Sequence, residues 1–446
     1  MKLFKKLKRK FLKFPNSVIS SKEHEFTYRE FLLSAENFSE KIKNFHCAAI
    51  LCSDEAFAAM AFVSCLAAGI TAVPLSKRYG EVYCKKIIEF INPDAVISDE
   101  NGKLAVKKTN LSGFDTKNSG CAAIMCTSGT TGTPKGVMLT DKNLLTNISD
   151  ICRYFNVTQK DKILISRPIY HCAVLSGEFL TGIFKGAGIK FSNEKFNPIK
   201  IGREIENSNI TVFAATPTVF SLLSRLKTDF ITLKKIVISG ECLDEVTAQK
   251  IYEKFCNKEI YSVYGLTEAS PRVTYLPPEF FKSNFSSVGK PLKSIKIKII
   301  DGMLYIKGKN VMKGYYKNPG LTKKVLKKGW LCTGDMAEFD KNGFVKIKGR
   351  KDNLIIKAGM NIYPAEIESR LKTDGRVKEV LSYGFKSKTG STDIGLKISG
   401  DFSSKDEVKK MCVSLLPEFQ IPVKIDILKS LPKNATGKIK RRNSKC

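Results

Sequence analysis

The sequence predicts an α/β protein: a large N-terminal domain of two α/β subdomains plus a small β-barrel-like subdomain, followed by a small α+β C-terminal domain. Three observations lead to this prediction. Helical patterns alternate with short apolar runs between residues 27 and 255, glycine-punctuated β segments take over from about residue 283, and helices and strands mix again after about residue 353. We expect the two domains to cover residues 1–350 and 351–446.

The two α/β subdomains are predicted from patterns typical of a parallel sheet covered by helices. In the first, a helical pattern at residues 27–45 precedes apolar runs at 48–52, 70–75 and 94–98, and residues 56–75 are typical of a buried helix that runs into a strand. In the second, the expected strands are residues 162–166, 188–191, 210–217 and 234–240, and the expected helices are residues 217–227 and 244–255.

The remaining units are smaller. The β-barrel-like subdomain is predicted from β segments at residues 294–300, 303–308 and 343–350. In the C-terminal domain, helical patterns at residues 364–373 and 404–416 alternate with strand patterns at residues 377–385, 392–398 and 423–428.

Composition limits the classes of function. The formal charge of +32 predicts attraction to anions such as nucleotides, coenzyme A, acidic carrier proteins, nucleic acid or anionic lipid, although a general abundance of lysine would give the same value. A nucleic-acid partner rests on charge alone and is not favoured. Thirteen scattered cysteines without zinc or redox spacing are typical of a reducing cytoplasm, and three histidines argue against a multi-histidine metal centre.

Residues 2–13 combine five apolar side chains with seven lysines and arginines. As a helix, this segment would have one apolar face and one basic face, a pattern compatible with peripheral contact at the inner face of a membrane. A surface helix packed on its own domain is the favoured alternative. No uninterrupted apolar segment follows, so we expect neither a secretory signal nor a spanning helix here.

The segment "CTSGTTGTPKG" at residues 126–136 concentrates hydroxyl groups, glycines and a lysine. Glycines let backbone amides approach a polyphosphate, hydroxyls donate hydrogen bonds, and a lysine adds positive charge. Its spacing is not the Walker pattern, and a plain glycine-rich turn is the alternative. We expect a turn between a strand and a helix, with Thr140 as the helix N-cap. The candidate phosphate-binding residues are Thr127, Ser128, Gly129, Thr130, Thr131, Gly132 and Lys135.

The string "TSGTTGTPKGV" closely resembles the phosphate-loop signature of the adenylate-forming superfamily, which includes acyl-CoA synthetases, peptide-synthetase adenylation domains and luciferases. Four more blocks follow in the family's order: "PIYH" from Pro168, "YGLTEAS" from Tyr264, the segment from Trp330 to Glu368, and "PKNATGKIKR" from Pro432. The resemblance runs from about residue 20 to the C-terminus. It implies an N-terminal AMP-binding domain joined by a hinge to a mobile C-terminal domain that carries a catalytic lysine.

The resemblance also assigns roles on the nucleotide side. Glu268 matches the family's metal ligand, a hard oxygen donor suited to Mg²⁺, and Thr267 would contact the α-phosphate. Tyr264, followed by Gly265, would present a flat face to the adenine. Asp335 would accept hydrogen bonds from the ribose hydroxyls, with Arg350 as a second ribose contact. Taken alone, an aspartate in a turn is more often a helix or turn cap than a ligand.

In the C-terminal domain the resemblance makes Lys438 the catalytic lysine, which would bridge the substrate carboxylate and the α-phosphate. Without it, "TGKIKRR" would be a basic tail. Asp352 takes the hinge position, about which family members rotate this domain between two half-reactions. The rotation presents the segment containing Ala358 and Gly359 to the pantetheine thiol, where Gly359 would leave room.

Substrate residues are less defined. Amino-acid-activating relatives usually place an aspartate in the pocket segment, whereas between Pro168 and Phe184 this chain has only Glu178. We therefore expect a carboxylic acid without an α-amino group, a fatty or aryl acid. The candidate acyl-pocket residues are His171, Val174, Leu175 and Phe213; a core histidine is the alternative for His171. Glu241, where relatives commonly have "GGAPL", would lie near the adenine or acyl pocket.

The predicted activity is ATP-dependent, Mg²⁺-assisted conversion of the acid to an acyl adenylate with release of pyrophosphate, then transfer to the thiol of coenzyme A. An alternative keeps the first step and delivers the acyl group to the phosphopantetheine of an acidic acyl carrier protein. Amino-acid adenylation and a non-catalytic nucleotide-binding relative are less favoured.

Overall fold

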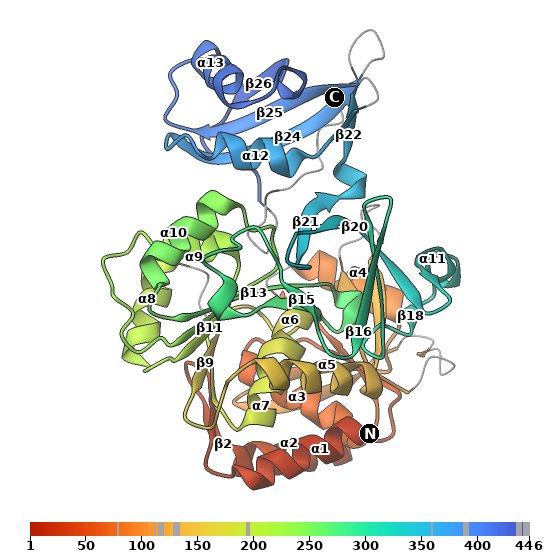
Figure 1. Cartoon of the computed structure of the whole chain (residues 1–446). Coiled ribbons are helices and arrows are strands. Elements are labelled where there is room, and N and C mark those ends of the chain that lie inside the picture. The colour runs from red at the N-terminus through yellow and green to blue at the C-terminus, as the bar shows by residue number, and fades with distance from the viewer. Residues whose placement is uncertain are drawn as a thin grey trace.

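The structure is a computed structural model of the 446-residue chain. It describes residues 1–77, 80–110, 113–114, 120–127, 134–192, 197–357, 360–386, 392–433 and 439. Figure 1 shows a large N-terminal region and a smaller C-terminal one, linked through the segment around β22. The predicted mixed α/β class is confirmed.

One large sheet of the N-terminal region contains nine strands among the described residues. Its central strands are parallel and its edge pairs are antiparallel, as in a sheet whose crossovers are helices. In spatial order the strands are β15 (Lys290–Pro291), β14 (Arg272–Leu276), β13 (Glu259–Gly265), β12 (Lys235–Ile238), β11 (Val212–Ala215), β9 (Lys162–Ile165), β10 (Gly188–Phe191), β1 (Val18–Ser20) and β2 (Glu25–Thr27).

A second sheet has seven strands in the part of the chain that the structure describes. Its centre, β7, β4, β3 and β5, is parallel, and antiparallel strands flank it. In spatial order the strands are β18 (Gly314–Tyr315), β8 (Lys135–Thr140), β7 (Cys121–Thr127), β4 (Thr71–Pro74), β3 (Cys47–Ile50), β5 (Ala95–Glu100) and β6 (Lys103–Lys108).

Helices fill the space between these sheets and cover their outer faces. α3 is buried on almost all sides and shares one core cluster with both sheets, which explains its uniformly apolar sequence. α8, α9 and α10 pack on the far face of the nine-stranded sheet, and α4 packs on the far face of the seven-stranded one. The helices are α2 (Tyr28–Ile42), α3 (Glu55–Ala68), α4 (Glu81–Ile91), α5 (Asp141–Tyr154), α6 (Cys172–Val174), the π-helix η3 (Leu175–Leu180), α7 (Thr181–Lys185), α8 (Pro198–Asn207), α9 (Pro217–Leu223), α10 (Glu245–Phe255), and the 3₁₀ turns η4 (Thr267–Ala269) and η5 (Pro278–Phe280).

The N-terminal basic segment forms helix α1 (Lys2–Lys13). Leu3, Leu7 and Phe11 are fully buried in the core, where Phe11 stacks on Phe31. The apolar face therefore packs on the protein's own domain, as the favoured alternative expected, and a membrane contact would have to use the lysines on the opposite face. Among the described residues, no helix combines the length and apolar character needed to cross a membrane.

A third sheet precedes the C-terminal region and matches the predicted Gly-punctuated β segments. Its strands among the described residues are β16 (Ile295–Ile300), β17 (Met303–Gly308), β20 (Trp330–Phe339), β19 (Leu326–Lys327) and β21 (Val345–Arg350), with α11 (Pro319–Val325) inserted before β19. β20 pairs with both β17 and β21, so one long strand connects the sheet.

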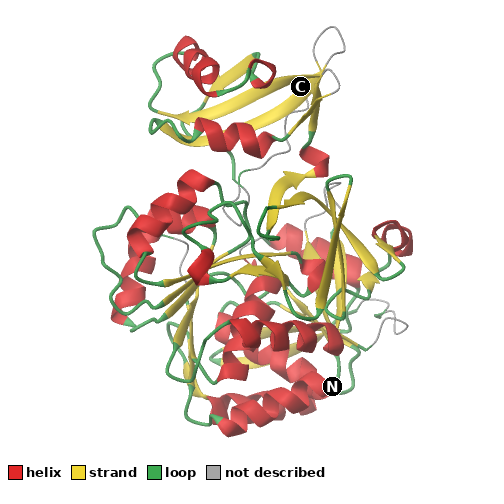
Figure 2. Cartoon of the chain, viewed as in Figure 1, coloured by secondary structure: helices red, strands yellow, loops and turns green. Residues whose placement is uncertain are grey.

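The C-terminal region has a core cluster of its own, built on a three-stranded sheet over which two helices pack. Figure 2 shows this sheet apart from the larger region. Its elements are η6 (Lys351–Asn353), the hairpin β22 (Ile355–Lys357) and β23 (Met360–Ile362), α12 (Pro364–Leu371), β24 (Val377–Lys386), β25 (Thr392–Gly400), α13 (Lys405–Leu415), η7 (Glu418–Gln420) and β26 (Lys424–Ile427).

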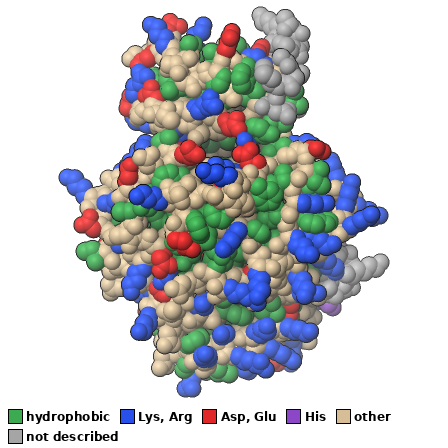
Figure 3. Space-filling model, viewed as in Figure 1, with side chains coloured by type: hydrophobic (Ala, Val, Ile, Leu, Met, Phe, Trp, Pro, Cys, Tyr) green, Lys and Arg blue, Asp and Glu red, His purple; other side chains and the backbone are tan. Residues whose placement is uncertain are grey.

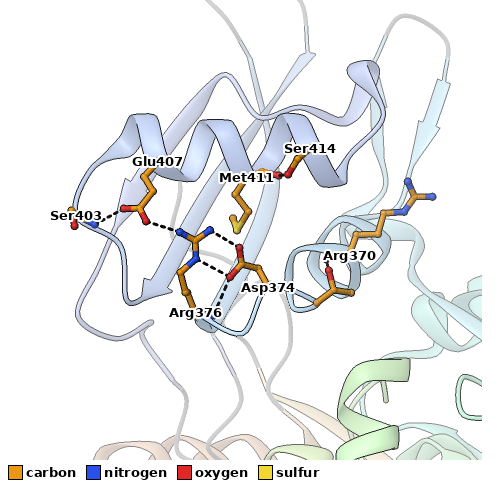
Figure 4. Close-up of polar contacts among 8 residues, drawn as sticks. Arg370, Asp374, Arg376, Ser403, Glu407, Met411 and Ser414 are labelled. Carbon is orange, nitrogen blue, oxygen red and sulfur yellow. Dashed lines mark hydrogen bonds and ion pairs between the residues drawn. The ribbon is translucent and has the colours of Figure 1, made fainter.

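Arg376 ties α13 to the turn after α12 (Figure 4). Its Nε and Nη2 atoms donate to the two carboxylate oxygens of Asp374 at 2.9 and 2.6 Å, and Nη1 donates to Glu407 at 2.6 Å. Glu407 also accepts from the backbone N–H of Ser403. A bidentate guanidinium fixes geometry better than a lysine would, so this network fixes how the first turn of α13 sits against the end of α12.

Candidate active site

The proposed adenine segment lies at the carboxyl end of β13, an edge where parallel α/β sheets commonly bind ligands. Gly265 is required there because a Cβ atom would lie 2.1 Å from the carbonyl oxygen of Pro271. The chain then enters η4, which holds Thr267 and Glu268. One turn of chain therefore brings these residues to the same edge as Tyr264.

Asp335 and Arg350 meet because they are paired in register on β20 and β21. The Arg350 guanidinium donates to Asp335 at 3.3 Å and to the carbonyl of Thr333 at 2.8 Å, and the Tyr264 hydroxyl donates to the other Asp335 oxygen at 2.5 Å. Three strands from two sheets thus supply one network, and a hydrogen bond to a charged group contributes about 1.5–3 kcal/mol. The structure brings together all three residues that the sequence assigned to adenine and ribose.

Burial sets the protonation behaviour of this network. Burial raises the pKa of the Asp335 carboxyl, while Arg350 and the Tyr264 hydroxyl oppose that rise. Burial and Asp335 together raise the pKa of Tyr264 well above its usual value, so the phenol remains a hydrogen-bond donor. The charge of Glu268 makes the smallest of these contributions and also raises the Asp335 pKa.

Glu268 is held by a residue that the sequence did not single out. The hydroxyl of Tyr315 donates to Glu268 Oε1 at 2.8 Å, and burial followed by the charge of Glu268 raises the Tyr315 pKa. Lys135 Nζ lies 6.0 Å from the centroid of the Tyr315 ring. Tyr315 therefore links the lysine of the phosphate-loop segment to the candidate metal ligand. No sequence motif marked it, because its role depends on the pairing of β18 with β8.

The phosphate-loop segment joins two strands, which corrects the expected strand-to-helix turn. Thr127 ends β7, Lys135 begins β8, and the two strands pair antiparallel as far as Thr127 and Lys135. The apolar run at residues 137–139 is buried between β7 and β18, so it extends as a strand before the helix begins. Thr140 caps α5 in a capping box with Asn143, as expected. Ser128, Gly129, Thr130, Thr131 and Gly132 lie outside the described residues.

The structure places the candidate acyl-pocket residues in two different parts of the N-terminal region. Val174 and Leu175 are buried at the junction of α6 and η3, and the ring of His171, at the N-cap of α6, lies tilted against that of Tyr170 with centroids 4.1 Å apart. Phe213 is misplaced in the prediction: it packs on Phe220 in the core beyond the nine-stranded sheet. Successive residues of a strand point to opposite faces of the sheet. A shift of one residue along β11 therefore exchanges the residues that face one side of the sheet with those that face the other.

The strand residues that face α5 and η3 are Val212 and Ala214. They line a cavity with Ile151, Tyr154, Ile163, Val237, Glu178 and Arg272, of which only Glu178 was noted from the sequence. Arg272 comes from β14, just after the η4 segment. No sequence pattern marked Arg272, because no spacing rule relates residue 178 to residue 272.

Glu241 lies in the loop between β12 and α10, where it accepts a 2.8 Å hydrogen bond from the hydroxyl of Thr218 at the start of α9. Within the described part of the chain, its hydrogen bonds go to Thr218 and not to Tyr264 or Asp335. Asp352 is exposed in η6, directly after Arg350 and Lys351, and its charge acts on Arg350. Ala358, Gly359 and Lys438 lie outside the described residues. The described residues contain no cluster of three or more His, Cys, Asp or Glu side chains that could hold a metal ion.

Among the residues that the structure describes, two ion pairs join the C-terminal region to the N-terminal one. Lys372 after α12 donates to Asp244, the N-cap of α10, at 2.9 Å. Lys348 on β21 lies 3.6 Å from Glu366 of α12. Both pairs are partly exposed, so each is worth well under the energy of a buried pair.

A family model described as "AMP-binding enzyme" matches residues 7–316. The 2-succinylbenzoate–CoA ligase of Bacillus pumilus is 32% identical over 358 residues, covering 78% of this chain and 72% of that protein. This match and the family model confirm the superfamily suggested by the ordered motifs.

Two solved structures of o-succinylbenzoate CoA synthetase from Bacillus subtilis are similar over the whole chain. The complex with the acyl-adenylate intermediate OSB-AMP has a TM-score of 0.84 at 25% identity, covering 98% of this chain and 97% of that one. A double mutant bound to a product analogue, OSB-NCoA, has a TM-score of 0.68 at 26% identity with the same coverage.

These similarities confirm the predicted fold class and the predicted reaction class, that of an AMP-forming acyl-CoA ligase which uses ATP, Mg²⁺ and coenzyme A. They leave the individual site residues as predictions. The chain belongs to the AMP-binding enzyme family.

Proposed function

We propose that this chain couples one particular carboxylic acid to coenzyme A at the site between β13, β20 and β21. In the first step a carboxylate oxygen attacks the α-phosphorus of ATP and pyrophosphate departs with the bonding electrons. In the second step the pantetheine sulfur attacks the acyl carbon, AMP leaves, and the thiol proton passes to solvent. Each step balances without an external oxidant or reductant.

The observation that carries this proposal is the convergence of two networks. Tyr264, Asp335 and Arg350 form one, Tyr315 and Glu268 form the other, and Glu268 acts on the Asp335 pKa. A carboxylate fixed by a guanidinium is suited to accept two hydroxyls of a ribose, and the ring face of Tyr264 is suited to adenine. We assign the nucleoside to the first network.

The residues beside Glu268 fit a magnesium ion bound together with phosphates. Mg²⁺ usually takes one or two protein carboxylates and completes its shell with water and substrate phosphates, and Glu268 provides such an oxygen. When bound, the ion would neutralise charge on the departing pyrophosphate. Tyr315 orients the carboxylate, Thr267 offers a hydroxyl to the α-phosphate, and Lys135 with the phosphate-loop residues would hold the β- and γ-phosphates.

The C-terminal roles rest on the motif resemblance. We assign Lys438 to the bridge between substrate carboxylate and α-phosphate, Asp352 to the hinge between domains 1–350 and 351–446, and the segment with Ala358 and Gly359 to the pantetheine channel. The higher TM-score with the acyl-adenylate complex than with the product-analogue complex supports the view that the domains here have the adenylate-forming arrangement. The Lys372–Asp244 pair would help to hold it.

A carrier protein is the second candidate for the acceptor, favoured by the formal charge of +32. Figure 3 shows lysine and arginine side chains over much of the visible face. An acidic carrier would be steered to such a surface, and so would an anionic lipid headgroup to the basic face of α1. Coenzyme A, itself anionic, is the simpler acceptor.

A pyrophosphate-release screen tests the proposal. The acids would cover graded fatty chains, aryl acids and amino acids, each measured alone, with coenzyme A, and with an acyl carrier protein. We expect acid-dependent pyrophosphate release and then a CoA thioester from the same acid. Failure of every acid despite ATP binding would contradict catalysis, and a thioester formed on the carrier protein alone would favour the second acceptor.

A further inference from the structure

Helix α1 is a strongly basic element that the proposed ligase reaction does not use. It contains seven lysines and arginines and no acidic residue. In Figure 1 it lies at the end of the molecule farthest from the C-terminal region, and Figure 3 shows lysine and arginine side chains gathered over that end of the visible face. Its charges therefore lie away from the nucleotide site and require a separate explanation.

The exposed side chains of α1 form one face. The apolar stripe that ends at Phe11 points into the core. Lys2, Lys5, Arg9 and Leu12 follow the spacing i, i+3, i+7, i+10, which at about 3.6 residues per turn places them on the side opposite to that stripe. All four are exposed. We call these four residues the outward face of α1.

Acidic residues of the neighbouring helix α2 do not neutralise this face. Glu36 pairs with Lys8 at 2.6 Å, Glu40 pairs with Lys43 at 2.9 Å, and Glu30 closes the capping box of its own helix. In the part of the chain that the structure describes, none of the three cations of the outward face has an acidic side chain within 4.0 Å. The outward face is therefore a set of unpaired positive charges.

Contacts on the core side hold α1 in place. The carboxylate of Asp141 accepts from the backbone N–H of Leu3 at 3.2 Å, at the helix end where the dipole favours an anion. The ring of Phe11 stacks on Phe31 and meets Tyr28 edge-on, with centroids 5.7 and 5.1 Å apart. The helix is thus formed before a partner arrives, so binding requires no folding of this segment.

Leu12 indicates which anionic partner fits this face. Its side chain is 55% exposed and lies one helical turn from Arg9. An aliphatic side chain among cations gains nothing from the phosphates of a nucleic acid, whereas at a bilayer surface it enters between the headgroups while the cations meet lipid phosphates. The apolar stripe is occupied by the core, so the contact is shallow and mainly electrostatic.

We propose that the outward face of α1 binds the surface of an anionic lipid bilayer. Lys2, Lys5 and Arg9 would face the lipid phosphates, and Leu12 would lie between the headgroups. Because the C-terminal region lies at the other end of the molecule, this orientation keeps it clear of the bilayer (Figure 1). The inference does not depend on the ligase function, since binding to a bilayer needs neither ATP nor an acid.

Co-sedimentation with vesicles tests the inference. We expect binding to vesicles of phosphatidylcholine mixed with phosphatidylglycerol, weakening as salt rises, and no binding to phosphatidylcholine alone. One cation near an anionic bilayer changes the binding constant about fivefold. The triple variant Lys2→Gln/Lys5→Gln/Arg9→Gln should therefore bind the mixed vesicles about 20-fold more weakly or worse, and Leu12→Ser about 2- to 10-fold more weakly.

Arg203→Gln/Lys227→Gln/Lys250→Gln is the matched control. It removes the same charge at exposed positions around α8, α9 and α10, away from α1. We expect it to bind the mixed vesicles within about twofold of the natural protein, because charges beyond a Debye length from the bilayer are screened. Unfolding midpoints show whether each variant is folded. An equal loss in the two triple variants would assign the binding to net charge and overturn the role of α1.

Two further results would overturn the inference. One is the absence of binding to the mixed vesicles at physiological salt, or equal binding to phosphatidylcholine alone. The other is tighter binding to a single-stranded oligonucleotide than to the mixed vesicles at the same salt, lost in the α1 triple variant and unchanged in Leu12→Ser, which would assign the face to nucleic acid. These measurements contain no substrate, so their failure leaves the ligase function untouched.

Discussion

The nucleotide side and the acyl side of the site are built in different ways. On the nucleotide side, Tyr264 and Asp335 each belong to a short local motif, and strand pairing brings them together. Beside α5 and η3, Glu178 and Arg272 line one cavity and Arg167 pairs with Glu178, although no motif relates the three residues. Residues inside the family motifs are thus recognisable from the local sequence, whereas the residues that line this cavity are brought together only by the fold.

The largest expected effect concerns the chemistry that both sides share. Lys438→Ala should lower acid-dependent pyrophosphate release by on the order of 10³-fold, because it removes a cation from the transition state. Thioester formation from a supplied acyl adenylate should be spared. Rapid-quench measurement of each half-reaction checks this, with Lys440→Ala as the neighbouring control. Equal loss of both steps would refute the assigned role.

Asp335→Asn tests the nucleotide side. We expect the KM for ATP to rise about 10- to 100-fold, the value of one hydrogen bond to a charged group, with little change in the KM for the acid. With 2′,3′-dideoxy-ATP the variant and the natural protein should differ much less, because the ribose hydroxyls are absent. A difference that persists with this analogue would mean that Asp335 acts through the fold and not through the ribose.

Tyr315→Phe should have a smaller effect, seen in how the rate depends on the Mg²⁺ concentration. The ring and its approach to Lys135 remain, but Glu268 loses one hydrogen bond, so the Mg²⁺ concentration for half-maximal rate should rise about 2- to 10-fold. Titration of Mg²⁺ at saturating ATP and acid measures it. An unchanged dependence on Mg²⁺ together with an altered KM for the acid would contradict this role and would mean that Tyr315 acts on binding of the acid.

Lys372→Met should have the smallest effect. It breaks a partly exposed ion pair between the two regions, so we expect at most about a fivefold decrease in the adenylation rate and no decrease in thioester formation. Lys372 is the better choice than Asp244, because Asp244 also caps α10. A decrease in both half-reactions would show that the pair does not favour one domain arrangement.

The sequence predicted much of the fold because its patterns are local. The alternation of strands and helices, the buried character of α3, and the cap at Thr140 were all predicted, and the ordered motifs indicated the family that the comparisons confirm. Tyr264, Asp335 and Arg350 were singled out because each lies inside a motif, and the structure brings them together.

The failures share one cause, which is that strand pairing is not visible in a local pattern. The segment after Thr127 was expected to enter a helix, but residues 135–140 pair with β7 and β18. Phe213 was assigned to the pocket, but the register of β11 turns it to the other face. Tyr315 and Arg272 went unnoticed, since their partners lie 47 and about 100 residues away in the sequence.

The central claim is that this site forms an acyl adenylate, and a single-turnover reaction with ATP labelled at the α-phosphate tests it most directly. With an accepted acid, Mg²⁺ and no coenzyme A, we expect one labelled acyl adenylate per enzyme and one equivalent of pyrophosphate, and addition of coenzyme A should then release labelled AMP. Labelled ADP with inorganic phosphate in place of these products would contradict the account.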